Sequence, residues 1–423
     1  MKRLFFISML FSLGVACNKN EEIVTPKDSA NEEKVEKIDE FQPPGDKVVT
    51  ATEALTRADA ILSRFQTRST PRVVKSCEYF VAKPATRSLA DTIEVAFHLI
   101  NYEDNAGFAM VAADERATDI YAYSDEGELT PEILEGHPGM SIFLDGAIDH
   151  YQAEVRGLIP SPEPWPEDDP IGPVDPTRPS DIIKLPMELL NGKFYFCKTE
   201  EVFISTDPLT PFYWDQFYPY NHFCTPYVTG CGPTAMGKIM AYHRHPASFN
   251  GHTYNWDMIT ANERHTSLSD ATMMISRLVC DIGQDQPRIE YRTSDDGGTS
   301  TYFSENRETF LHFGYSCSTV MDFSSSLVVN NIDNRKPVWV GGQETLGSSG
   351  HIWHIDAYQD NRIIKTYYET TPPYNVYHKN IYHSYSYRCV WGWDTLYYTY
   401  CLSNAFNGYA RDVKMICGIT PNN

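Results

Sequence analysis

Residues Trp214–Pro246 read WDQFYPYNHFCTPYVTGCGPTAMGKIMAYHRHP, and this stretch decides the fold that we expect for the C-terminal half of the chain. After Cys231, apolar residues recur at the three- to four-residue spacing of a helix, at Ala235, Ile239 and Tyr242. A cysteine at a helix start lies near unpaired backbone N–H groups and the positive end of the helix dipole. Both effects favour a thiolate nucleophile, so we expect a lowered pKa for Cys231. Taken alone, the residue fits equally well a buried apolar thiol or half of a disulfide.

A thiolate nucleophile needs a base, and the best candidate lies in residues 347–356, GSSGHIWHID. A glycine and serine turn before His351 predicts a strand that begins with an imidazole at a loop, where a base can reach another element. His354 follows three positions later. Side chains alternate along a strand, so only one of the two histidines can face a cleft.

A cysteine followed much later by a histidine is the order found in papain-like cysteine peptidases. The chain resembles the streptopain family of secreted bacterial cysteine peptidases over nearly all of residues 207–421. The elements that carry the resemblance include Gln216, Gly230-Cys231-Gly232-Pro233-Thr234-Ala235-Met236, Tyr254-Asn255-Trp256, Gly350-His351 and Trp391-Gly392-Trp393.

The resemblance implies a papain-like, two-lobed α+β peptidase domain at residues 207–423 that works without a cofactor. It implies that Cys231 is the nucleophile and His351 the general base. Gln216 and the Cys231 backbone N–H would form the oxyanion hole, and Trp391 would shield the histidine from water. Protein and peptide substrates follow from this assignment.

Two features depart from the family pattern. Val390 stands where the family usually carries an asparagine that orients the histidine, so that role is either absent or filled by another group such as a backbone carbonyl. An insert dense in Tyr and His, Tyr367–Tyr387, separates His351 from Trp391. The insert either folds over the cleft or marks a degenerate active site.

The N-terminal half predicts a small α+β domain at residues 50–157, with a helix capped by Thr52 and a hairpin between Ile93–Leu99 and Phe108–Ala113. Its Asn101-Tyr102 and Gly107-Phe108-Ala109-Met110-Val111 segments resemble the inhibitory propeptide of the same family. A proline-rich linker and activation region follows at residues 158–206, with eight prolines between Leu158 and Pro179. The resemblance therefore implies a zymogen whose own propeptide is an intramolecular inhibitor.

The first seventeen residues read MKRLFFISMLFSLGVAC, which is typical of an export signal. Small residues before Cys17 resemble a lipoprotein cleavage site, so we expect lipidation at Cys17 and a disordered tether at residues 18–49. The predicted location is the outer membrane, as a periplasmic or cell-surface lipoprotein that later cleavage can release. Ordinary signal-peptidase cleavage is the alternative. Removal of Cys17 leaves nine cysteines, an odd number in an oxidising compartment.

Charge and composition narrow the remaining function classes. The formal net charge of −21 repels phosphate backbones, which argues against nucleic-acid binding. No metal site is expected, because His243-Arg244-His245 lies at a helix end without carboxylates. We expect a cysteine endopeptidase made as a zymogen. The alternatives are a catalytically impaired pseudopeptidase that acts as a surface binding or decoy protein, and a zinc hydrolase that uses the histidine clusters.

Overall fold

The computed structural model describes residues 47–65, 71–82, 94–159, 182–295, 298–343, 350–393, 396–406 and 412–422. The predicted export signal, Cys17, most of the tether and the proline segment at 160–181 lie outside the described residues. All described residues belong to one compact unit, Glu36–Asn423. None of the helices among them combines the length and the apolar character that a membrane crossing requires.

The N-terminal domain is a four-strand antiparallel sheet between helices. Its elements are α1 (Ala51–Leu62), β1 (Val74–Ala82), β2 (Val95–Tyr102), η1 (Glu103–Asn105), β3 (Phe108–Ala112), β4 (Ile120–Ser124), α2 (Pro131–Gly136) and α3 (Pro138–Val155). The predicted hairpin is present as β2 paired with β3. The predicted cap is displaced, because Thr50 rather than Thr52 caps α1, in a reciprocal capping box with Glu53.

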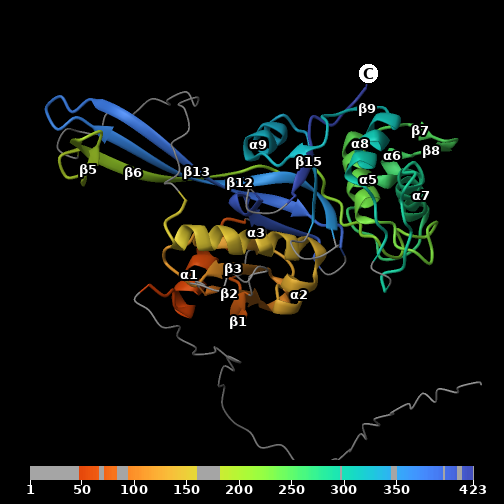
Figure 1. Cartoon of the computed structure of the whole chain (residues 1–423), viewed down its shortest axis with the longest axis horizontal. Coiled ribbons are helices and arrows are strands. Elements are labelled where there is room, and N and C mark those ends of the chain that lie inside the picture. The colour runs from red at the N-terminus through yellow and green to blue at the C-terminus, as the bar shows by residue number, and fades with distance from the viewer. Residues whose placement is uncertain are drawn as a thin grey trace, which may run out of the picture. The chain divides into compact units, whose positions relative to one another are not determined.

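Both faces of this sheet are covered. Ala54, Ala58 and Leu62 of α1 pack on one face, and α3 packs on the other through Phe143 and Ile148. Every residue of β2 is therefore buried, although it lies in an antiparallel sheet. Figure 1 shows α3 lying along the sheet and beside the strands of the C-terminal half.

The C-terminal half has two lobes, as the resemblance implies. One lobe is helical, with α5 (Cys231–His243), α6 (Trp256–Ile259), α7 (Asp270–Gln284) and α8 (Phe303–His312). The other contains α9 (Ser325–Asp333), β10 (Met321–Asp322), β11 (Val338–Gln343), β12 (Gly350–Tyr368), β13 (Val376–Val390), β14 (Tyr398–Leu402), η2 (Ser403–Phe406) and β15 (Lys414–Ile416). Two short strand pairs complete the C-terminal half, β7 (Ser248–Phe249) with β8 (His252–Thr253) and β9 (Tyr315–Ser316) with β16 (Thr420–Pro421).

One sheet runs through both halves of the chain, in the order β1-β2-β3-β4-β14-β13-β12-β11-β15-β10. The junction is the antiparallel pair β4–β14, where Tyr123 lies opposite Tyr400. The rings of these two tyrosines stack at 5.4 Å, and the Tyr123 hydroxyl donates to Gln359 Oε1 at 2.7 Å. The N-terminal domain is thus joined to the C-terminal half by backbone pairing as well as by side chains.

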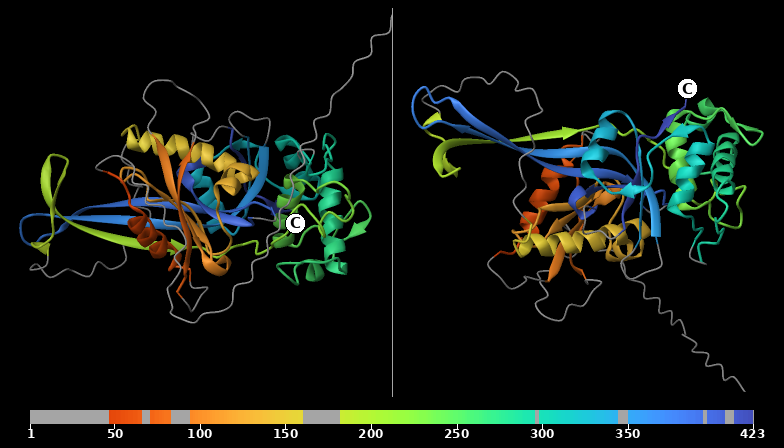
Figure 2. Two further views of the ribbon diagram at one scale, coloured as in Figure 1. Left: turned by 90° about the horizontal axis from the view of Figure 1, so that it is seen from below. Right: turned by 45° about the horizontal axis from the view of Figure 1, so that its top comes forward.

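The Tyr- and His-rich insert forms a long hairpin rather than a flap over Cys231. The outer parts of β12 and β13 pair with each other, and β6 (Lys193–Ser205) pairs with β12 from Ser205 opposite Gln359 to Phe196 opposite Tyr368. β5 (Met187–Leu190) closes the edge. We call these four segments the β-arm. Figure 1 and Figure 2 show it extending away from α5.

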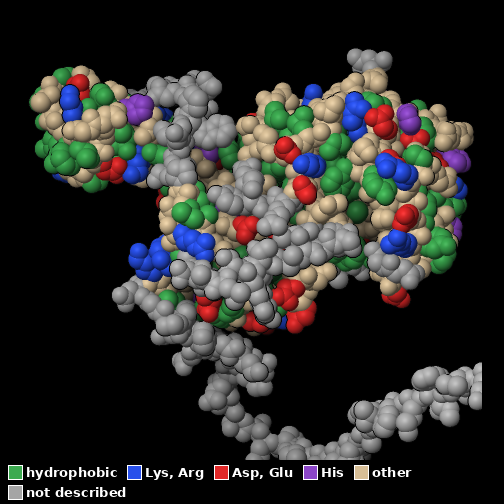
Figure 3. All heavy atoms as spheres, viewed as in Figure 1, with side chains coloured by type: hydrophobic (Ala, Val, Ile, Leu, Met, Phe, Trp, Pro, Cys, Tyr) green, Lys and Arg blue, Asp and Glu red, His purple; other side chains and the backbone are tan. Residues whose placement is uncertain are grey.

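The β-arm corrects one sequence-based prediction and excludes one of the two alternatives for the insert. Residues 187–190 and 193–205, which we placed in the linker, are strands, because β6 satisfies its backbone groups on β12. The insert does not cover Cys231, because its strands bond to one another and to β6 instead. Figure 3 shows apolar side chains gathered at the end of the arm, where Met187, Leu189 and Phe194 are about 60% exposed.

Candidate active site

Cys231 is the first residue of α5, as the sequence predicts. Gly230 takes φ +94°, a left-handed conformation that lets the chain turn sharply into the helix. Gly232 allows a close approach, because a Cβ there would lie 2.6 Å from Asn306 Oδ1 and 3.3 Å from Ile352 Cδ1. The helix start is therefore pressed against α8 and β12, and Cys231 is half-buried.

The pKa of the Cys231 thiol is shifted in the direction opposite to the one that we expected. Burial raises the pKa of Cys231, although the backbone N–H groups of Ile352, Gly232 and Cys231 itself act in the opposite direction. The helix start alone suggested a lowered pKa. The sequence could not show that α8 and β12 also pack against the helix start, where burial disfavours the charged form of the thiol.

Gln216 lies next to the Cys231 helix. It is buried, and its Nε2 donates to the Gly392 carbonyl at 3.5 Å. Its own carbonyl accepts the Thr229 N–H at 3.1 Å, and Thr229 Oγ1 lies 2.9 Å from Thr234 Oγ1 in the first turn of α5. Hydrogen bonds therefore tie Gln216 to the segment that leads into Cys231.

His351 begins the inward part of β12 and is fully buried. Its Nε2–H donates to the Trp391 carbonyl at 2.9 Å. Its ring lies 6.3 Å from Trp353 and 6.3 Å from Trp391, measured between ring centroids. The next residue, Ile352, packs in the other core, with α5. Because strand side chains alternate, His351 is turned toward α3 and away from the cysteine helix.

The two residues of the predicted pair make different contacts. Within the described part of the chain, no hydrogen bond joins Cys231 Sγ to His351, whose ring faces His137 at 6.0 Å. His137 caps α3, and its Nδ1 accepts the N–H groups of Gly139 and Met140 at 3.1 and 3.2 Å. The N-terminal domain thus supplies one of the rings that surround His351. We call His137, Trp353 and Trp391, whose rings lie around His351, the cage.

Both caged histidines are neutral at physiological pH. Burial lowers the pKa of His351 to about 4, and the Lys238 cation adds to this. Burial and the neighbouring His351 lower the pKa of His137 to about 3. A neutral His137 is also what the cap demands, since Nδ1 must carry a lone pair to accept two N–H groups.

Trp391 closes the cage. Its ring is buried, its Nε1–H donates to Thr399 Oγ1 at 3.1 Å, and it lies 5.8 Å from the His137 ring. Gly139 of α3 permits this contact, because a Cβ at that position would lie only 2.3 Å from Trp391 Cε3. The tryptophan that we placed beside His351 therefore contacts both the histidine and the N-terminal domain.

Val390 does not face the histidine. Its side chain packs in the core of α1, Tyr398 and Tyr400. The group that holds His351 here is instead the backbone carbonyl of the next residue, Trp391. The other histidine of the motif, His354, is fully buried and shares a 2.6 Å hydrogen bond with Thr210 Oγ1.

Sequence reasoning missed two residues of this region, His137 and Lys238. His137 lies more than two hundred positions from His351, and nothing in its local sequence points to it. Lys238 did carry a signal, because it is seven residues after Cys231, on the same face of a helix, between apolar neighbours. Among the described residues, no group of three or more His, Cys, Asp or Glu side chains is arranged to hold a metal ion.

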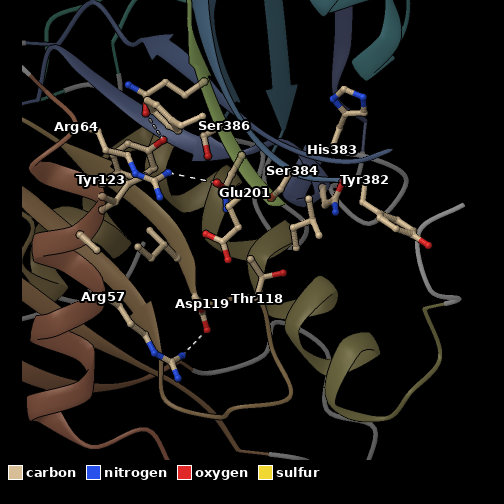
Figure 4. Close-up of a pocket in the computed structure, with 18 of the residues that line it drawn as sticks. Arg57, Arg64, Thr118, Asp119, Tyr123, Glu201, Tyr382, His383, Ser384 and Ser386 are labelled. Carbon is tan, nitrogen blue, oxygen red and sulfur yellow. Dashed lines mark hydrogen bonds and ion pairs between the residues drawn. The ribbon is translucent and has the colours of Figure 1, made fainter. Parts of the chain in front are cut away.

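A separate cavity of about 820 Å³ lies between the N-terminal domain and the base of the β-arm (Figure 4). Arg64 spans it, with its Nη1 donating to Asn361 Oδ1 at 3.3 Å and its guanidinium 4.5 Å from the Phe203 ring. Arg57 pairs with Asp119 on the N-terminal side. Neither Cys231 nor His351 lines this cavity, which is a seam between the two halves rather than the catalytic cleft.

Comparison with known proteins decides the family. Residues 214–400 match the model of the peptidase C10 family, and residues 46–151 match the model of the Spi protease inhibitor. Residues 214–400 are a C10-family cysteine peptidase domain. The inhibitor match covers the N-terminal domain from just before α1 to within α3, so an inhibitor-type domain precedes the C10-family domain in the same chain.

Individual relatives agree with this assignment. The chain is 25% identical over 391 residues to the thiol protease/hemagglutinin PrtT of Porphyromonas gingivalis, and the match covers 81% of this chain. The chain spans only 38% of the length of that relative. Among solved structures, a prointerpain A fragment of Prevotella intermedia shares the fold, with a TM-score of 0.52 and 14% identity. That match covers 82% of this chain and all of the fragment.

Proposed function

We propose that this chain is the latent precursor of an exported cysteine endopeptidase, with Cys231 as nucleophile and His351 as general base. One observation carries the proposal. Cys231 begins α5, and hydrogen bonds tie Gln216 to the segment before that helix, whereas the His351 ring is held by the Trp391 carbonyl and lies against His137 of the inhibitor-type domain.

The chemistry follows once His351 faces Cys231. The imidazole takes the thiol proton as Sγ attacks the carbonyl carbon of the scissile peptide bond. The oxyanion accepts hydrogen bonds from Gln216 Nε2 and the Cys231 backbone N–H. The imidazolium then gives its proton to the leaving amine as the C–N bond breaks. Water, deprotonated by the same imidazole, hydrolyses the thioester and restores the thiol.

Maturation requires the inhibitor domain to leave. β6 is bonded to β12 along its length, so a cut that frees the inhibitor domain has to fall between the end of α3 at Val155 and Met187. This range includes the proline segment. The mature peptidase then keeps the β-arm, and β14 loses its pairing with β4.

The test is casein hydrolysis by the full chain after cleavage in the linker. Cys231→Ala and His351→Ala are expected to abolish hydrolysis. Gln216→Ala is expected to lower kcat by about 10²–10³-fold, the usual loss for one oxyanion-hole donor. Lys193→Met, an exchange at an exposed β-arm residue, is the control. Hydrolysis that survives Cys231→Ala would contradict the proposal.

Export is a separate part of the proposal. The signal at residues 1–17 supports lipidation at Cys17 and an outer-membrane anchor. Metabolic labelling of cells with a clickable fatty acid should mark the wild-type protein and leave Cys17→Ser unmarked. Equal labelling of both proteins would refute lipidation at this residue, and absence of label on both would favour ordinary signal-peptidase cleavage.

Val390 favours one second candidate, a pseudopeptidase that acts as a surface binding or decoy protein. The side chain of Val390 has no hydrogen-bonding atom, so it cannot orient the histidine. Wild-type protein that is cut in the linker, remains folded and hydrolyses no casein would support this candidate over the peptidase.

A further inference from the structure

Two thiols outside the catalytic pair, Cys224 and Cys280, lie against each other in the helical lobe. Cys224 lies in the turns that lead from Gln216 to α5, and Cys280 lies near the C-terminal end of α7. Both are buried, both are free thiols in the structure, and their side chains hydrogen-bond to each other. The pair therefore lies between the helix that packs on α5 and the segment that enters α5.

The backbone around Cys224 runs along one face of α7. The Phe223 N–H donates to Ser276 Oγ at 3.0 Å, and Cys280 Sγ lies 3.8 Å from the Phe223 carbonyl oxygen. Ser276 and Cys280 are four residues apart, so they share a face of the helix. The Phe223 carbonyl belongs to the peptide group that joins Phe223 to Cys224. These two contacts hold Cys224 over Cys280 independently of the bond between the thiols.

The two thiols differ in acidity. The hydrogen bond with Cys224 lowers the pKa of Cys280, and the charge of Arg277, one helical turn earlier, acts in the same direction. The hydrogen bond with Cys280 and burial raise the pKa of Cys224. Gln284 Nε2 also donates to Cys280 Sγ, at 3.4 Å. Cys280 is therefore the member of the pair that more readily becomes a thiolate, the form that attacks a disulfide.

Two other pairs of neighbouring cysteines are worse placed for a covalent link. Cys389 and Cys401 lie on paired strands, but Cys401 is two positions from the residue opposite Cys389. Such diagonal neighbours are about 7–8 Å apart, beyond the span of an unstrained disulfide. Cys417 bonds through its backbone to Ser318 rather than to Cys317, with the Ser318 N–H donating to its carbonyl at 2.9 Å.

We propose that Cys224 and Cys280 form a disulfide in an oxidising compartment, and that this bond fastens the turns between Gln216 and Cys231 to α7. The inference rests on the proposed export, because disulfides form and persist outside the reducing cytosol. The bond leaves Cys231 as a thiol, as the proposed peptidase requires.

The oxidant is a disulfide, and the bond forms by two exchange steps as the turns close over α7. The Cys280 thiolate attacks one sulfur of the oxidant and releases the other half as a thiolate. The Cys224 thiolate then attacks Cys280 Sγ in the mixed disulfide and releases the second half. The two cysteines lose two electrons and two protons, and the oxidant takes up both to become two thiols.

The bond has a measurable consequence for stability. It links residues more than fifty positions apart, so it restricts the unfolded chain strongly. Loss of the bond should lower Tm by about 5–10 °C.

The experiment is a map of the cysteines in the full chain, refolded with a mixture of oxidised and reduced glutathione. Free thiols are blocked with iodoacetamide, and the protein is digested and mapped by mass without reduction. The expected result is one linked peptide pair that joins Cys224 to Cys280, with Cys231 alkylated. Cys224→Ser should lose the link and leave Cys280 alkylated. Cys317→Ser, the same exchange at another cysteine, is the matched control and should keep the link.

Thermal unfolding tests the stabilising effect on the same samples. A reductant should lower Tm of the wild type and of Cys317→Ser by about 5–10 °C and leave Tm of Cys224→Ser unchanged. Comparison of oxidised with reduced wild type gives the effect even if Cys224→Ser does not fold. Alkylation of both cysteines in the refolded wild type, a link from either to another cysteine, or equal Tm before and after reduction would overturn the proposal.

The map requires neither peptidase activity nor export. A linked pair in a chain that hydrolyses no casein would count against the proposed peptidase and leave this inference standing. Two alkylated cysteines in an active peptidase would do the reverse, so the two failures are distinguishable.

Discussion

Gly139 offers a direct test of the proposed latency. In an ordinary helix, Gly→Ala stabilises by roughly 0.5–1 kcal/mol because it removes backbone freedom from the unfolded chain. At Gly139 the added methyl group would lie 2.3, 2.7 and 3.0 Å from the Cε3, Cζ3 and Cδ2 atoms of Trp391. Forcing atoms into a packed interface of this kind costs about 1–3 kcal/mol. We therefore expect Gly139→Ala to weaken the contact between α3 and Trp391, and so the cage around His351.

A packing cost in the lower part of this range, about 1–2 kcal/mol, corresponds to a roughly 5- to 30-fold shift toward the state in which His351 is released. The assay is the rate at which an epoxide affinity label of thiol proteases modifies Cys231 in the intact, uncut chain. Gly136→Ala is the matched control, because a Cβ at that glycine meets nothing within 4 Å. Gly139→Ala should be labelled faster than both wild type and Gly136→Ala. Equal labelling of all three would refute the reasoning that Trp391 packing on α3 maintains latency.

Three further predictions concern buried charge. The folded pKa values of His351, about 4, and His137, about 3, lie below the ordinary value of 6.5. The stability that comes from keeping these two histidines neutral is therefore fully present above pH 6.5 and is lost as the pH falls toward 4. Tm should drop by several degrees between pH 7 and pH 5, and a flat Tm would contradict this. Lys238, with a folded pKa of about 7 against 10.5, should make stability rise with pH between those values. Lys238→Met should remove that slope in urea unfolding, and an unchanged slope would count against the assignment. Arg388→Met leaves Asp356 buried without its ion-pair partner and should cost about 3–5 kcal/mol in the same assay, a loss below 1 kcal/mol being inconsistent with the buried pair.

Local patterns were enough to predict the elements that depend on local chemistry. The apolar spacing after Cys231 predicts a helix whose first turn begins at or next to that residue, as α5 does, and the alternation in residues 93–113 predicts the hairpin of β2 and β3. The α+β class, the two lobes and the inhibitor-type domain were also predicted correctly.

The errors arose where distant segments meet. The thiol pKa direction was wrong because Ile352 and α8 close over the helix start, which no periodicity reveals. The orientation of His351 depends on His137, Gly139 and Trp391, which lie in separate parts of the chain.

The β-arm was missed for a different reason. The proline-rich composition before residue 180 led us to extend the linker prediction over β6. That strand is stabilised by its partner β12, which lies more than 150 residues away.

The central claim is that an intact Cys231–His351 pair exists in the chain and is withheld by the inhibitor domain. The measurement that tests it most directly is the same epoxide label applied to the full chain before and after cleavage in the linker, followed by peptide mass mapping. The account predicts slow labelling of the intact chain, stoichiometric labelling of Cys231 alone after cleavage, and loss of that labelling in His351→Ala. Absence of selective labelling after cleavage, or labelling that does not depend on His351, would contradict it.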